Sequence, residues 1–83
     1  MTVQAQVRAF ILDSYYVSDP AELTDELSLI DSGVVDSTGM LEIILFIEGQ
    51  YGLHVEDWET TPENLETIGR IADFVARKQA AAA

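Results

Sequence analysis

The stretch DSTGMLEIILFIEGQYG, from Asp36 to Gly52, is the feature that most constrains the fold of this chain. Its apolar residues recur at helical spacing, which predicts a helix from Asp36 or Ser37 to Tyr51. Asp36 is a favourable N-cap residue, and Gly52 suits the position just after a helix end. The residues that share one face of this helix, and that we expect in the core, are Met40, Ile43, Ile44, Ile47 and Tyr51.

Two leucines of the same stretch lie away from this core face. Leu41 and Leu45 fall on the stripe that also carries Ser37 and Glu48. The helix therefore has apolar side chains that its own core does not require. We expect them to contact something outside the domain.

The N-terminal third of the chain predicts one helix followed by a long loop. The helix ends near Tyr16, and its stripe consists of Val3, Val7, Phe10, Ile11 and Ser14. Between residues 17 and 35 no period holds, and Pro20 and Gly33 interrupt any helix. Because so long a loop is unusual in a small domain, we expect it to pack down through its apolar residues. These are Leu23, Leu27, Leu29 and Ile30.

The C-terminal third predicts a short helix and a long one. Thr61 is the N-cap candidate of the short helix, with Pro62 at its first position. Thr67 caps the last helix, whose buried stripe is Ile68, Ile71, Ala72 and Val75. We expect Arg77 and Lys78 to complement the C-terminal end of its dipole.

The organisation that follows is one all-α domain of three long helices and one short helix over residues 1–78. Residues 79–83 are expected to form a disordered tail. Met1 stands at a natural distance from the first helix, which favours a discrete protein.

Composition narrows the classes of function. A chain of 83 residues buries a modest core, and without cysteine it has neither disulfides nor thiolate chemistry. Four basic against fifteen acidic residues give a net charge of −11, which repels nucleic acids and anionic lipids and favours partners with basic patches. No bilayer-spanning run or basic leader segment is present in the sequence, so we expect a cytoplasmic protein. We also expect it to be a monomer.

Catalytic and metal sites find little support. Ser37 as a hydrolytic nucleophile needs a base, and the single histidine, His54, falls in a loop where it is expected to be solvated. The spacing from Asp31 to Glu42 matches a calcium loop, but the residues between them lack the required oxygens and turn glycine. We predict no enzyme activity and no metal site. Trp58 is predicted to cover the edge of the core, with an exposed partner anchor as the alternative.

Ser37 itself has two interpretations. It is a spare capping hydroxyl, or it is an exposed hydroxyl beside free backbone amides at a positive helix end, which suits an attached phosphate.

The context of Ser37 resembles the acyl carrier protein family, whose members bind phosphopantetheine. The resemblance lies in the Asp36–Ser37 pair, the lead-in LIDSGVV, the following LEIILFIEGQYG and the later TPENLETI, and it extends from the first helix to Val75. It implies a right-handed bundle of three long helices and one short helix with a long first loop. It also implies 4′-phosphopantetheine on Ser37, attached from coenzyme A by a phosphopantetheinyl transferase, with Asp36 in the attachment motif.

The resemblance further implies a carrier that acts as a substrate of enzymes. The thiol of the arm holds a cargo as a thioester, and tethering raises its effective concentration at each partner. The implied partners are an acyl- or aminoacyl-loading ligase and a downstream transferase. The expected partner-docking residues on the second helix are Thr38, Leu41, Glu42, Leu45 and Glu48.

One departure bears on the pathway. The family usually has a bulky apolar residue directly after the modified serine, whereas this chain has Thr38 and then Gly39. The exposed stripe is also thinly charged, which favours specialised acyl or aminoacyl metabolism over ordinary fatty acid synthesis. The alternative hypothesis, from a different class, is an acidic helical docking module without a prosthetic group.

Overall fold

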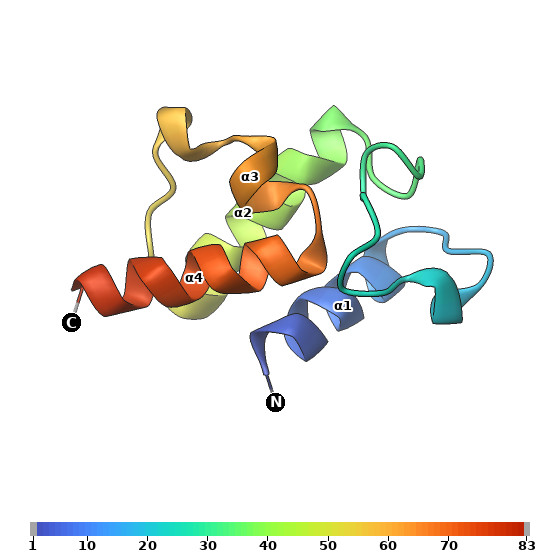
Figure 1. The fold of residues 1–83 in the computed structure, drawn as a ribbon, viewed down its shortest axis with the longest axis horizontal. Helices are drawn as coiled ribbons and strands as arrows, with labels where there is room; N and C mark the ends of the chain where they lie inside the picture. Colours follow the sequence, from blue (N-terminus) through green and yellow to red (C-terminus); the bar gives the residue numbers. More distant parts are fainter. Residues whose placement is uncertain (1, 83) are drawn as a thin grey trace.

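The computed structural model describes residues 2–82, and its elements are helical (Figure 1). In chain order they are α1 (Val3–Ser14), the 3₁₀ turn η1 (Pro20–Glu22), α2 (Ser37–Tyr51), the 3₁₀ turn η2 (Asp57–Glu59), α3 (Pro62–Leu65) and α4 (Ile68–Ala82). No strand occurs in residues 2–82, so the all-α prediction of three long helices and one short helix is confirmed. The two 3₁₀ turns are additions to the predicted elements.

Helix α4 is the centre of the packing, because it contacts each of the other three helices. Figure 1 shows α4 crossing the lower half of the domain, with α1 beside its N-terminal part and α2 behind it. The hydrophobic core that these helices enclose consists of Val7, Ile11, Leu23, Leu29, Val35, Ile43, Ile44, Ile47, Val55, Leu65, Ile68, Ile71, Phe74 and Val75. It includes most of the predicted apolar stripes.

The helix ends follow from the capping residues. The Asp36 carboxylate accepts a hydrogen bond from the Gly39 amide at 2.7 Å, and Gly52 ends α2 in the left-handed conformation with φ of 63°. The Thr67 hydroxyl accepts from the amide of Arg70 at 3.1 Å, at the start of α4. These three predicted caps are confirmed.

Phe74 is a core residue that lies outside the stripe predicted for α4. Phe74 is buried at 1% exposure, although only Ile68, Ile71, Ala72 and Val75 were expected to face inward on α4. The difference arises because α4 is packed by three other helices and therefore buries a wider face than a helix with one neighbour.

The long loop between α1 and α2 is packed down, as predicted, with one exception. Leu23 and Leu29 are fully buried and Leu27 is partly buried, whereas Ile30 is 44% exposed. The expectation for Ile30 was wrong because the turn that closes at Gly33, where the amide of Gly33 donates to the carbonyl of Ile30, carries that residue outward.

Arg8 of α1 anchors this loop. Its guanidinium donates to the carbonyl of Pro20 at 2.6 Å and also to the carbonyl of Leu23. Farther along, the Leu29 amide donates to the carbonyl of Glu66 at 2.9 Å. The loop is thereby attached to α1 and to the segment between α3 and α4, which holds the start of α2 in a defined place.

The C-terminal segment differs from the expected disordered tail. Helix α4 continues to Ala82, because alanine has the highest helix propensity and the run after Lys78 is rich in it. Ala83, the end of the expected tail, and Met1 lie outside the described residues.

Arg77 and Lys78 consequently do not lie in the last turn of α4, and they bond to other elements. Arg77 donates to the side-chain oxygen of Asn64 at 2.8 Å, and Lys78 pairs with Glu59. A third basic residue of α4, Arg70, pairs with Glu66 at 3.0 Å. The predicted complement of the helix dipole was therefore wrong.

Within residues 2–82, no helix combines the length and the apolar character needed to cross a bilayer.

Candidate functional site

Ser37 is the first residue of α2 and is exposed. The capping position is filled by Asp36, whose carboxylate already bonds to the Gly39 amide. The interpretation of Ser37 as the capping hydroxyl is therefore not needed, and its side chain is left at the surface beside the positive end of a long helix.

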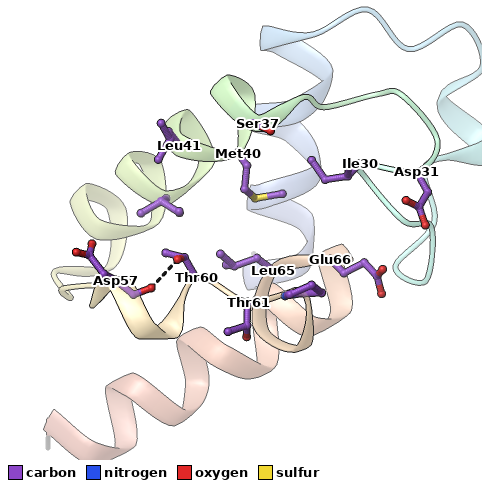
Figure 2. Close-up of a pocket in the computed structure, with 12 residues that line it drawn as sticks. Ile30, Asp31, Ser37, Met40, Leu41, Asp57, Thr60, Thr61, Leu65 and Glu66 are labelled. Atoms are coloured by element: carbon purple, nitrogen blue, oxygen red, sulfur yellow. Dashed lines mark hydrogen bonds between the residues drawn. The ribbon is translucent and has the colours of Figure 1, made fainter.

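Beside Ser37 lies a groove of about 430 Å³ between α2 and the segment containing η2 and α3 (Figure 2). Figure 2 shows Met40 extending from α2 into this space, with Ile30 and Leu65 bordering it from the other elements. The full lining is Ile30, Asp31, Ser37, Met40, Leu41, Ile44, Asp57, Thr60, Thr61, Pro62, Leu65 and Glu66. A group attached to Ser37 would thus start at the border of an apolar groove.

The first turn of α2 is held against the end of α1 by Tyr15. A Cβ built on Gly39 would lie 2.9 Å from Cγ1 of Val35 and 3.1 Å from the ring of Tyr15. Gly39 is therefore required by close packing. Gly39, which is part of the departure from the family pattern, thus makes room for the ring of Tyr15.

The hydroxyl of Tyr15 lies 3.1 Å from the carbonyl of Gly39 and 2.8 Å from Oε1 of Glu42. Burial, and next the hydrogen bond to the Glu42 carboxylate, raise the pKa of Tyr15 to about 12. The phenol consequently stays neutral and can donate to Glu42. Sequence reasoning missed Tyr15, because nothing in its local spacing distinguishes it from its exposed neighbour Tyr16.

The apolar part of the predicted docking stripe is exposed, as expected. Leu41 is 60% and Leu45 is 67% exposed, and Thr38 lies at the surface. Glu42 is exposed and accepts a hydrogen bond from Tyr15, whereas Glu48 is only partly exposed.

The side chain of Glu48 is 24% exposed, and its Oε2 accepts a hydrogen bond from the amide of Val55 at 2.9 Å. His54 approaches the same oxygen at 3.4 Å through Nδ1, and its Nε2 lies 3.5 Å from Glu56. The His54 ring is itself largely exposed, as predicted for a loop histidine. Glu48 therefore anchors the chain that follows α2.

Trp58 is 76% exposed, so the prediction that it covers the core edge was wrong. Consecutive side chains of a 3₁₀ turn point in different directions. In η2 the side chain of Trp58 faces solvent, and that of the following residue, Glu59, faces inward and is buried.

Glu59 links η2 to α4 and was not singled out in the sequence. Its Oε1 lies 2.8 Å from Nζ of Lys78 and 3.0 Å from the amide nitrogen of Glu56. The ammonium of Lys78, and next the Glu56 amide, lower the pKa of Glu59 against the opposing effect of burial. The ion pair of Glu59 with Lys78 holds η2 against α4, and η2 contributes Asp57 to the lining of the groove. No cluster of metal-ligating side chains is found in residues 2–82.

No protein-family model matches the chain. Among curated proteins it is similar to the D-alanyl carrier protein of Streptococcus gordonii, with 32% identity over 75 residues that cover 82% of this chain and 92% of the relative. It is also similar to the acyl carrier protein of Thermosynechococcus vestitus, with 32% identity over 92% of this chain and 90% of the relative. The acyl carrier protein of Thermotoga maritima is 27% identical over 74 residues, which cover 89% of this chain and 88% of the relative. With the helical fold and the exposed serine at the start of α2, these relatives establish that the chain belongs to the acyl carrier protein family.

Proposed function

We propose that this protein carries an acyl or aminoacyl cargo as a thioester on 4′-phosphopantetheine attached to Ser37. The observation that carries the proposal is the exposed hydroxyl of Ser37 as the first residue of α2, directly after a separate capping residue. The names of the relatives, acyl carrier protein and D-alanyl carrier protein, favour these two classes of cargo.

Attachment is a transfer of a phosphoryl-linked group. The oxygen of Ser37 forms a bond to the phosphorus that carries the pantetheine of coenzyme A, the bond from that phosphorus to the adenosine-bearing phosphate breaks, and the serine proton leaves with a base of the transferase. Because the transferase supplies the base, the carrier needs no activating residue of its own. When attached, the arm supplies a thiol that holds the cargo.

The surroundings of Ser37 fit such an arm. The helix start favours a negatively charged phosphodiester, although the protein as a whole is acidic. The groove beside it is bordered by apolar side chains of Met40, Ile44 and Leu65 and is open at the surface near Leu41. The protein positions the arm, and a ligase, a downstream transferase and the attaching transferase perform the chemistry.

The test is attachment itself. The purified protein, freed of any native modification, is incubated with coenzyme A, Mg²⁺ and a broad-specificity phosphopantetheinyl transferase, and its intact mass is measured. We expect a gain equal to the mass of the arm in the wild type. The same gain is expected in Ser18→Ala, a control at an exposed serine of the loop, and none in Ser37→Ala. An unmodified wild type would contradict the proposal and favour the docking module without a prosthetic group.

A further inference from the structure

We infer that Tyr15 is a positioning residue for the attachment reaction at Ser37, because the contacts of its hydroxyl hold the turn of α2 that carries the serine. The inference rests on the carrier function proposed above. It gives a role in that reaction to a side chain at the C-terminal end of α1, outside the motif that contains the serine. Tyr15 acts through the backbone of Gly39 and the carboxylate of Glu42.

Gly39, two residues after Ser37, is held through both of its backbone groups. Its amide donates to the Asp36 carboxylate at 2.7 Å, and its carbonyl oxygen lies 3.1 Å from the Tyr15 hydroxyl. The first contact is local and comes from the capping residue, whereas the second joins positions 24 residues apart in the chain. Ser37 therefore lies in a turn that is fixed both by its own cap and by the end of another helix.

The same hydroxyl also reaches the next turn of α2. It lies 2.8 Å from Oε1 of Glu42, and since it has one proton for two acceptors, the shorter bond to the charged carboxylate is the stronger one. Burial is the first cause that raises the pKa of Tyr15 to about 12, so the phenol keeps this proton at neutral pH. Gly39 and Glu42 are three residues apart and thus lie on the same side of the helix. One oxygen atom of Tyr15 therefore contacts two successive turns of α2.

The ring of Tyr15 is itself held in place. Phe10 meets it edge to face, with the ring centroids 6.4 Å apart, and Phe10 in turn stacks on Phe46 of α2 with centroids 4.4 Å apart. A Cβ at Gly39 would lie only 3.1 Å from the ring, so the turn has little room to shift toward α1. The hydroxyl consequently has a fixed position from which to hold the start of α2.

Attachment depends on the direction in which the oxygen of Ser37 is presented. This oxygen bonds to the phosphorus of coenzyme A while the bond to the leaving, adenosine-bearing phosphate breaks and the serine proton passes to a base of the transferase. A misplacement of about 1 Å can reduce the rate of such a step about 100-fold, so a loosened first turn should slow it. Binding to the transferase should change little in Tyr15→Phe, because the lost oxygen is already bonded within the domain.

The experiment compares three phenylalanine variants. Tyr15→Phe removes the hydroxyl and keeps the ring. Tyr51→Phe, the matched control, removes a hydroxyl that also joins α2 to α1, through Gln6, but at the opposite end of α2 from Ser37. Tyr16→Phe removes the hydroxyl of a residue that is 85% exposed and controls for the substitution itself.

Each protein is reacted with coenzyme A, Mg²⁺ and an excess of a broad-specificity phosphopantetheinyl transferase, and the single-turnover rate is followed by intact mass. Varying the transferase concentration separates the maximal rate from the concentration that gives half of it. We expect Tyr15→Phe to lower the maximal rate about tenfold and to change the half-saturating concentration by less than about twofold. Both quantities should stay within about twofold of the wild type in Tyr51→Phe and Tyr16→Phe.

Amide hydrogen exchange of the unmodified proteins, measured by NMR, gives a readout that needs no transferase. Exchange at residues 39–42 should be at least about threefold faster in Tyr15→Phe than in the wild type, and unchanged in Tyr51→Phe. All measurements are made well below the lowest Tm of the set, so that a general loss of stability does not contribute.

Four results would overturn the inference. They are an unchanged maximal rate for Tyr15→Phe, a change in its half-saturating concentration alone, an equal loss of rate in Tyr51→Phe, and unchanged exchange at residues 39–42. Each of them would leave the carrier function intact, provided that the wild type gains the arm. A wild type that gains no arm would overturn the carrier function and the inference with it.

Discussion

At the scale of single residues, the start of α2 depends on a close contact between Gly39 and Tyr15. The missing side chain of Gly39 lets the tyrosine ring approach the helix, and its hydroxyl then reaches Glu42. This contact joins positions 24 residues apart in the chain. The pattern around Ser37 predicts the helix start, but it contains no signal for a partner at that separation.

Gly39→Ala and Gly49→Ala should have opposite effects on stability. Both positions are in α2, where alanine favours the helix by up to about 1 kcal/mol. A Cβ at Gly49 meets open space, so Gly49→Ala should raise the free energy of unfolding by about that amount. A Cβ at Gly39 meets the side chains of the buried Val35 and the partly buried Tyr15, and overpacking of about 1–3 kcal/mol should outweigh the gain.

Denaturant unfolding of the two variants, followed by circular dichroism, measures both changes. A stabilised Gly39→Ala would show that Tyr15 moves freely and does not hold the first turn.

At the scale of elements, the sequence predicts helix existence, most helix ends and most of the core. Its successes, such as Asp36 and Gly52 at the ends of α2, depend on local chemistry. Its errors have non-local causes. The inward side of Phe74 depends on how many helices pack on α4, and the exposure of Trp58 depends on the orientation of η2. The place of Ser37 at the start of α2 likewise follows from local pattern, whereas the long-range contacts of Tyr15 and Glu59 do not.

The attachment of η2 to α4 by Glu59 and Lys78 should make stability depend on pH. The pKa of Glu59 is lowered in the folded protein, chiefly by Lys78, so its stabilising effect is complete above the ordinary carboxyl pKa of about 4.3. The effect is lost as the pH falls through the lowered value. Glu59→Gln should therefore reduce the free energy of unfolding at pH 7 by about 1–2 kcal/mol.

The difference between the wild type and Glu59→Gln should shrink as the pH is lowered below about 4. Urea unfolding across this range measures it, with Glu26→Gln, at an exposed carboxyl, as the control. A difference that does not change with pH would mean that the two residues are not coupled by charge.

At the scale of the whole molecule, the main feature is the large excess of negative over positive charge. A net charge of −11 on 83 residues places many carboxylates within a Debye length of one another, about 10 Å at 0.1 M salt. Their repulsion is relieved when the chain expands, so it acts against the folded state.

Added sodium chloride should therefore raise Tm, because screening weakens the repulsion more than it weakens the few ion pairs of the domain. Thermal scans at increasing salt test this expectation. A Tm that stays constant or falls would show that attractive pairs, such as the one between Glu59 and Lys78, dominate the electrostatics of the folded state.

The bonds made by the basic side chains have a consequence for how copies of this protein meet. Arg8 holds the loop, Arg70 pairs with Glu66, Arg77 donates to Asn64 and Lys78 pairs with Glu59. These are the four Lys and Arg residues of the chain. An approaching copy therefore meets carboxylates with hardly any positive charge to offset them. Crowded molecules should stay dispersed, and each should reach an enzyme singly.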